Sequence, residues 1–308
     1  MSAKAELLDD RGEAAADTEF FRSGPFLDAE GVTHTLKIDT DQGELLAPLL
    51  VREIPGTDQR DAVSPYGYPG FANPGSIEIE PAVIDFSATG LVSVFIRHAL
   101  GPSPLIGATE RNVVQIADPA LPAKSRPSDR RQVRRNLEAG YELELVPGAE
   151  TNPEQRAAFN DVYEQTMRRA GAADHYFFGL AYFDRILEAE GTWLVLVHDP
   201  DGVLAAASIA AVSDGFLHYY LSGSSDAHLR SAPMKNVVAR LVEHSAELDL
   251  PLNLGGGISP GDALEEFKRG FANRQQAWLT SELVCDEETY AQLSAGREAG
   301  GFFPAYRA

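Results

Sequence analysis

The stretch TWLVLVHDPDGVLAAASIAAVSDGFLHYYLS (192–222) contains three apolar runs separated by two short turns. The runs cover 192–198, 203–212 and 216–222, and the turns consist of Asp, Gly, Pro and Ser. Turn residues at this spacing favour hairpin connections between neighbouring strands. The stretch therefore predicts an antiparallel meander of three strands.

A helix precedes this meander, and a mixed pattern of strands and helices follows it. Asn152, Pro153 and Gln155 have the residue types of a helix start: an N-cap, a first helical residue and a side chain that bonds back to the N-cap. Apolar residues at helical spacing between Met234 and Ser245 predict another helix. Three more elements follow, a strand, a helix and a strand, at 250–254, 262–270 and 275–284. The second half of the chain is therefore expected to be an α/β domain.

The first half of the chain also mixes strands and helices. Its expected strands and its one expected helix lie at 32–38, 44–53, 90–97, 111–117 and 141–146, and at about 129–139. The segment 61–76 (DAVSPYGYPGFANPGS) is rich in Gly, Pro and Tyr, which is typical of a structured loop. Pro147 and Gly148 precede the helix start, so we expect a domain boundary there. The expected parts are a disordered lead-in (1–18), a first domain (19–150) and a second domain (151–308).

Composition excludes several classes of protein. No run of eighteen apolar residues offers a membrane span, and the acidic, alanine-rich N-terminus lacks the features of a signal peptide, so we expect a cytoplasmic protein. Cys285 is the single cysteine, which excludes a disulfide framework and a thiolate metal site. The seven histidines are scattered without metal-ligand spacing, so we expect no metal.

An ordered set of motifs resembles the Fem-type (FemAB-like) aminoacyltransferases, a branch of the GNAT-like acyltransferases. The motifs of the first half are SPYGYPG (64–70), FIRH (95–98) and RRNLEAGYELEL (134–145). Those of the second half are YEQTMRRAGAADHYFF (163–178), HYYLSGS (218–224) and LGGGISPGDALEEFKRGF (254–271). The resemblance runs from about residue 40 to residue 293. It implies two GNAT-like domains, each a mixed, largely antiparallel sheet flanked by helices, and amide-forming chemistry.

The last of these motifs contains the candidate catalytic residue. Asp262 and Glu265 form a capping pair, which places a helix start just after three consecutive glycines. Lys268 lies at the edge of the apolar face of this helix, and the resemblance assigns catalysis to this lysine. Its ammonium group would stabilise the oxyanion that forms at the acyl carbon. The alternative from the residues alone is a surface lysine whose aliphatic stem lies on apolar neighbours.

Further residues are candidates for substrate binding. Arg169 matches an arginine of the motif, where a guanidinium suits a phosphate or carboxylate of the acceptor; it would otherwise only complement the helix dipole. His218 and Tyr220 share one face of a strand and Tyr219 takes the other, and which face lines the site stays open. Packing roles remain the alternative for the aromatic candidates. The complete set is Arg169, Tyr66, Tyr68, Tyr176, His218, Tyr220 and Phe267.

Basic residues are concentrated in one short region of an acidic protein. The chain has 26 basic and 46 acidic residues and a net charge of −20, so its overall field does not attract nucleic acid. An RNA ligand would therefore need a local basic patch. The candidates are Arg130, Arg131, Arg134 and Arg135, with Lys124 and Arg126 nearby. A solvated helix face is the alternative reading of this cluster.

The identity of the acyl donor depends on the segment between the meander and the next helix. GNAT-like enzymes that use acetyl-CoA hold its pyrophosphate there with the backbone of a glycine-rich loop. Here the segment reads AHLRSAPM (227–234), without glycine, and Pro233 has no N–H to donate. This favours aminoacyl-tRNA as donor, with no cofactor, and an amine of a peptidoglycan precursor or small secondary metabolite as acceptor. The alternatives are an acyl-CoA-dependent N-acetyltransferase and a non-catalytic GNAT-shaped binding module.

Overall fold

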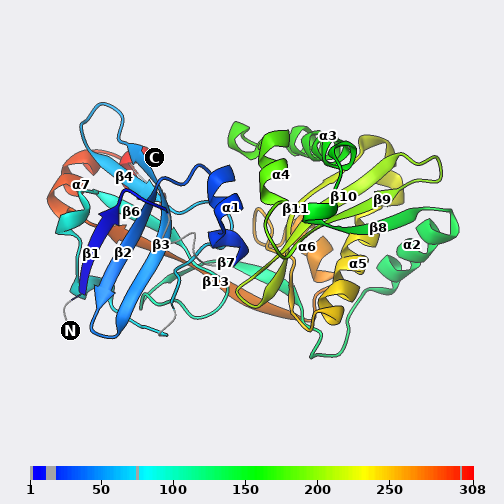
Figure 1. Ribbon diagram of the computed structural model, residues 1–308, viewed down its shortest axis with the longest axis horizontal. Helices are drawn as coiled ribbons and strands as arrows, with labels where there is room; N and C mark the ends of the chain where they lie inside the picture. The colour runs from blue at the N-terminus through cyan, green and yellow to red at the C-terminus, as the bar shows by residue number, and fades with distance from the viewer. Residues whose placement is uncertain (1–2, 12–18, 74–75, 299) are drawn as a thin grey trace. The chain divides into compact units, whose positions relative to one another are not determined.

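The structure is a computed structural model and describes residues 3–11, 19–73, 76–298 and 300–308 (Figure 1). Its chain forms two compact units: Met1–Arg111 with Ala277–Ala308, and Asn112–Gln276. We refer to them as the first and the second unit. This division differs from the boundary expected near residue 150, because the elements between residues 112 and 150 pack with the second unit.

Two of those elements show why. Strand β8 (Glu142–Pro147) pairs antiparallel with β9 (Thr192–His198) along its whole length. Helix α2 (Pro127–Glu138) packs on α5 (Met234–Glu247). Residues 112–150 therefore belong to the second unit, because the strand and the helix that they contact lie there.

The sheet of the second unit contains the predicted meander. Its strand order is β7-β12-β11-β10-β9-β8. The bounds not yet given are β7 (Thr109–Ala117), β10 (Leu204–Ser213), β11 (Phe216–Ser224) and β12 (Leu252–Asn253). Strands β9, β10 and β11 pair antiparallel, as expected, whereas β11 and β12 are parallel. Parallel pairing requires a crossover between the two strands, and α5 provides it.

Helices cover both faces of this sheet. Figure 1 shows α3 (Pro153–Ala170) and α4 (Leu180–Ile186) on one side of the strands and α2 and α5 on the other. Val237, Val238 and Leu241 of α5 are fully buried and pack against Val195 and Val197 of β9. Helix α6 (Ala263–Arg269) follows β12. Helix α4 is absent from the sequence-based expectation.

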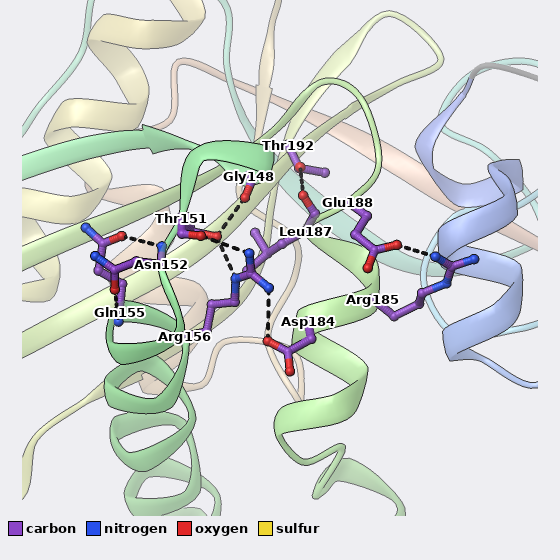
Figure 2. A network of polar contacts seen from close by, with 10 residues as sticks. All are labelled: Gly148, Thr151, Asn152, Gln155, Arg156, Asp184, Arg185, Leu187, Glu188 and Thr192. Carbon is purple, nitrogen blue, oxygen red and sulfur yellow. Dashed lines mark hydrogen bonds and ion pairs between the residues drawn. The ribbon is translucent and has the colours of Figure 1, made fainter.

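The start of α3 is fixed by polar contacts (Figure 2). Asn152 Oδ1 accepts the Gln155 N–H at 2.8 Å, and Gln155 Oε1 accepts the Asn152 N–H at 3.0 Å, which confirms the predicted capping box. Arg156 donates to Thr151 Oγ1 at 2.8 Å and to Asp184 Oδ1 of α4 at 3.2 Å. The first turn of α3 is therefore joined to both the preceding loop and α4.

The strands of the first unit also combine parallel and antiparallel pairs. Its strand order is β5-β1-β2-β3-β4-β6-β13. The bounds are β1 (Ala3–Leu8), β2 (His34–Thr40), β3 (Gly43–Glu53), β4 (Arg60–Val63), β5 (Ile84–Asp85), β6 (Ser93–Arg97) and β13 (Arg274–Val284). Two short helices, α1 (Gly24–Ala29) and α7 (Glu287–Ser294), accompany it. The pairs β1–β5 and β4–β6 are parallel, and the other printed pairs are antiparallel.

Two expectations for this unit were wrong in part. Residues 3–8 of the expected disordered lead-in form β1, which pairs with β2 over five residues. Residues 1–2 and 12–18 of that lead-in lie outside the described residues. The expected loop 61–76 begins inside β4, whose last residue is Val63, and its residues 74–75 also lie outside the described part.

A buried ion cluster connects the C-terminal segment to the sheet of the first unit. Asp61 of β4 is completely buried and accepts hydrogen bonds from Arg52 Nε at 2.9 Å and Arg307 Nη2 at 3.0 Å. Tyr306 donates to the same carboxylate at 3.1 Å. We call these four residues the Asp61 cluster. It holds the segment after α7 against β3 and β4.

Across the described ranges, the structure contains no helix with the length and apolar character needed to cross a membrane.

Candidate active site

A cavity of about 300 Å³ lies in the second unit beside β11. Four lining residues from α3 and β11 have hydroxyl groups, and we call them the hydroxyl wall: Thr166, Tyr219, Ser222 and Ser224. Six lining residues are apolar, and we call them the apolar wall: Leu229, Ala232, Pro233, Met234, Leu264 and Phe267. They come from the turn after β11, the start of α5, and α6. Gly223 and Lys235 complete the lining.

A β-bulge interrupts the pairing of β11 with β10. Tyr219 pairs with Ala210 and Leu221 pairs with Ile209, so Tyr220 is the extra residue between them. Tyr219 lines the cavity, and its hydroxyl donates to Ser222 Oγ at 2.7 Å. Burial raises the pKa of Tyr219 to about 12. Tyr219 therefore acts near neutral pH as a hydrogen-bonding hydroxyl and not as a base.

The two predicted residues of β11 have other positions. His218 is buried; its Nε2 bonds to Ser213 O at 3.1 Å and its Nδ1 to the Asn253 amide at 3.1 Å. Burial lowers the pKa of His218 to about 4, which keeps the ring neutral in this network. Tyr220 bonds to the Tyr182 hydroxyl at 2.8 Å. Neither His218 nor Tyr220 lines the cavity, so the face of Tyr219 is the one that does.

Lys268 is buried at the end of α6. Lys268 is 8% exposed, and its Nζ donates to Gly256 O at 2.6 Å. Burial lowers the pKa of Lys268 to about 8, against the opposing effect of the Asp262 charge. The surface-lysine alternative does not describe this geometry. Phe267, the preceding residue, lines the cavity, whereas Lys268 is not among the lining residues.

The loop before α6 places the carbonyl that Lys268 uses. A Cβ atom at Gly256 would lie 2.5 Å from Asn112 Nδ2, so any larger residue there would have to displace the Asn112 side chain. Asn112 Nδ2 also donates to Gly257 O at 3.2 Å. Asp262 caps α6 by accepting the Glu265 N–H at 2.7 Å. The glycine run and the capped helix together fix the position of the lysine.

Arg169 lies next to the cavity and is ion-paired. Its guanidinium bonds to Asp226, to Thr166 Oγ1 at 3.0 Å and to Ser224 O at 3.4 Å. Thr166 and Ser224 belong to the hydroxyl wall. Tyr176 does not line the cavity; its carbonyl accepts the Tyr163 hydroxyl at 2.8 Å. An acceptor that binds Arg169 would therefore have to compete with Asp226.

Tyr66 and Tyr68 belong to the first unit. The Tyr66 N–H donates to Glu30 Oε2 at 3.0 Å, and 38% of this residue is exposed. The Tyr68 ring packs against Phe21 and Trp278, with ring centroids 5.6 Å and 5.5 Å away. A role of either tyrosine in substrate binding stays a prediction.

The basic helix α2 has two different faces. Its inner face binds both ends of the segment 231–236, which contributes four residues to the cavity lining. Asn136 donates to Ser231 O at 2.9 Å and to Asn236 Oδ1 at 2.7 Å. Asp129, also on this face, accepts Lys235 Nζ at 2.8 Å. The outer face is exposed and consists of Arg130, Arg131, Arg134 and Arg135. Helix α2 thus positions this segment while presenting four guanidinium groups to solvent.

The turn after β11 uses most of its backbone donors internally. The N–H groups of His228, Ala232 and Lys235 donate to carbonyls of Ser225, Leu229 and Ala232 at 3.1–3.2 Å. Pro233 has no N–H group. A pyrophosphate at this turn would find few free backbone donors.

Sequence reasoning missed most of the cavity lining. Lys268 and Phe267 were singled out by the resemblance, whereas Tyr219, Ser222, Met234 and Lys235 were not. The one sequence signal for Tyr219 is that it lies between His218 and Tyr220, which are both candidates for substrate binding. No group of His, Cys, Asp and Glu side chains within the described part of the chain is arranged to hold a metal ion.

Comparison with known proteins supports an acyltransferase. Residues 123–269 match the family described as "Acetyltransferase (GNAT) domain". No curated protein matches the chain. Among solved structures, FemX aligns over 94% of this chain and 99% of its own, with a TM-score of 0.62 and 12% identity.

Two further structures are similar over most of their length. The structure titled L-PGS, from Bacillus licheniformis, aligns over 92% of this chain and 94% of its own, with a TM-score of 0.58 and 13% identity. The second is the C-terminal domain of a putative lysylphosphatidylglycerol synthetase from Agrobacterium fabrum. It also aligns over 92% of this chain and 94% of its own, with a TM-score of 0.58 and 10% identity. At these identities the likeness concerns the fold. The expected fold class, with two GNAT-like domains, and the resemblance to the Fem-type fold are confirmed.

Proposed function

We propose that this chain, an acyltransferase whose second unit carries a GNAT domain, transfers an aminoacyl group from a carrier RNA to an amine. The acceptor nitrogen attacks the ester carbonyl of the aminoacyl group. An amide bond forms, the ester C–O bond breaks, and the terminal ribose oxygen of the RNA receives the proton that the amine loses. The acceptor is an amine of a peptidoglycan precursor or of a small metabolite.

The observation that carries this proposal is the environment of Lys268. Its ammonium group is buried, and its hydrogen-bond partner is the neutral carbonyl of Gly256 at 2.6 Å. A cation in such a site stabilises a developing oxyanion more than a solvated cation does. Because the pKa of Lys268 is lowered to about 8, the group also loses and regains a proton easily near neutral pH. Lys268 would thus assist departure of the ribose oxygen.

Two features favour a carrier RNA over coenzyme A. The turn after β11 has no glycine, and its N–H groups at three positions bond within the turn. The outer face of α2 offers four exposed arginines to phosphates. In a chain with a net charge of −20, such a local patch is what an RNA ligand requires.

A product analysis tests the proposal directly. The purified protein is incubated with a pool of charged tRNAs, acyl-CoAs and amine acceptors, and the products are identified by mass spectrometry. We expect an aminoacylated amine whose formation depends on charged tRNA. Products that carry an acyl group from coenzyme A would instead establish the N-acetyltransferase alternative, and no product would favour the non-catalytic binding module.

Substitution of Lys268 tests its role in this reaction. Lys268→Met should lower kcat by about 10²–10³-fold, the usual effect of removing one oxyanion-stabilising group. The matched control is Arg269→Met, which removes the neighbouring cation on α6, an arginine paired with Glu265 and Glu266. Near-normal turnover of a folded Lys268→Met protein would exclude the assigned role.

A further inference from the structure

The cavity combines two chemically different walls. The hydroxyl wall offers oxygen atoms: the Ser222 hydroxyl accepts the Tyr219 hydrogen and keeps its own O–H available for donation. The apolar wall offers side chains without hydrogen-bonding groups. Such a cavity fits an occupant with one polar end and one apolar end.

The charges at the cavity disfavour an occupant with a charged side chain. Of the described residues that line it, Lys235 alone is charged. Its Nζ lies 2.8 Å from Asp129, whose side chain is 9% exposed, so this ammonium is already paired. A cationic side chain would find no carboxylate among the described lining residues and would face the Lys235 ammonium. An anionic occupant would have to displace Asp129, and burying an unpaired charge is unfavourable.

Two residues of the apolar wall are exposed although they are large and apolar. Leu229 is 45% exposed and Leu264 is 39% exposed. Covering such side chains with an apolar group removes apolar surface from water and favours binding. The cavity volume of about 300 Å³ equals that of about ten water molecules at ~30 Å³ each. This size suits one acyl group with its side chain.

We propose that this cavity selects the acyl group, and that its occupant is an aminoacyl group with an uncharged, apolar side chain. The side chain lies against the apolar wall, with Leu264 and Phe267 as its main contacts. The amino group, which all aminoacyl groups share, and the reacting carbonyl lie toward the hydroxyl wall. The assignment of an aminoacyl group rests on the proposed function, whereas the preference for an apolar side chain follows from the lining alone.

Stable donor analogues test this selectivity. The probes are 3′-amino-3′-deoxyadenosine molecules that carry leucine, methionine, phenylalanine, lysine or glutamate in amide linkage, and Kd is measured by calorimetry. We expect the three apolar probes to bind at least about tenfold more tightly than the lysyl and glutamyl probes. Equal affinities across the five probes would overturn the proposal.

A matched pair of variants tests whether the side chain contacts Leu264. Leu264→Glu places a carboxylate in the apolar wall and should raise affinity for the lysyl probe and lower affinity for the leucyl probe. Leu264→Gln has nearly the same shape without the charge and should not favour the lysyl probe. Thermal melting verifies that both variants are folded. An unchanged ranking in a folded Leu264→Glu protein would show that the side chain binds elsewhere.

Acyl-CoA probes separate this proposal from the proposed function. If isovaleryl-CoA binds more tightly than acetyl-CoA while all aminoacyl probes fail to bind, the apolar preference stands and the RNA donor is wrong. If the aminoacyl probes bind without a side-chain ranking, the donor class stands and the proposed selectivity is wrong. Absence of binding by every probe would overturn the selectivity as well.

Discussion

Asp61 in the first unit and Lys268 in the second unit are both buried charged residues, but their surroundings differ. Asp61 is bonded to two arginines and a tyrosine. Lys268 is bonded to a single neutral carbonyl among the described residues. A buried charge with several opposite partners stabilises a fold, whereas a buried charge with weak compensation is typical of a functional site. The difference agrees with a structural role for Asp61 and with the chemical role that we propose for Lys268.

The largest expected effect is the loss of stability when Asp61 is removed. Asp61→Ala leaves Arg52 and Arg307 without their shared carboxylate in a buried position. We expect the free energy of unfolding to fall by about 3–5 kcal/mol, as for other broken buried ion pairs. Urea denaturation of both proteins measures the difference. A loss below about 1 kcal/mol would contradict the structural role of the Asp61 cluster.

The second effect is a pH dependence that Lys268 alone should produce. Its folded pKa of about 8 lies below the unfolded value of 10.5, so the unfolded chain binds more protons between these values. Stability therefore rises as the pH increases through this window, by about 3 kcal/mol in total. The raised pKa values of Cys285 and Tyr219, about 12 each, act in the opposite direction above pH 9, so the contribution of Lys268 is the part of the slope that the wild-type protein has and Lys268→Met lacks. The same slope in both proteins would show that Lys268 is not the group responsible.

The third effect concerns stability at neutral pH. Lys268→Met removes a buried charge and keeps a similar volume, so we expect a gain of about 1 kcal/mol, reduced by the lost bond to Gly256. Thermal melting at pH 7 measures this gain. Clear destabilisation would mean that the ammonium has a structural role like that of Asp61, and the contrast between the two residues would disappear.

The smallest effect is expected on the outer face of α2. Arg130→Gln combined with Arg134→Gln should change stability by no more than about 0.5 kcal/mol, because both residues are exposed. The dependence of tRNA affinity on salt should nevertheless become weaker, by about one unit of slope for each lost phosphate contact. Filter binding at several salt concentrations measures this slope. An unaltered slope would exclude these arginines from RNA binding.

Local sequence patterns predicted the elements that local interactions determine. The capping box at Asn152 and the hairpin turns of the meander involve residues close in sequence, and both are present. Strand β1 was missed because Ala, Lys and Glu, which make up most of AKAELL, have low strand propensity, and because its pairing with β2 is a long-range interaction. The Asp61 cluster was equally invisible, because Arg307 lies 246 residues away in the chain.

The candidate site was predicted only in part, for a related reason. Lys268 and Phe267 follow a recognisable helix start, so their motif could be placed on a helix. Alternation separates Tyr219 from His218 and Tyr220, but it does not tell which face of the strand lines the cavity, because that depends on α3, α5 and α6, which lie elsewhere in the sequence. Met234 and Lys235 line the cavity because the turn after β11 and its contacts with α2 place them there. Neither the turn nor these contacts have a simple sequence pattern.

The first unit is built from two distant parts of the chain, and this has a consequence for its synthesis. Its strand β6 pairs with β13, yet 165 residues of the second unit (112–276) separate Arg111 from Ala277. At about 5–20 residues per second, a ribosome needs about 10 to 30 seconds to make that intervening segment. During this interval the second unit can fold as a continuous domain, while the edge of β6 waits without its partner. Translation speed and chaperone access over this segment therefore decide how long an incomplete sheet is exposed in the cell.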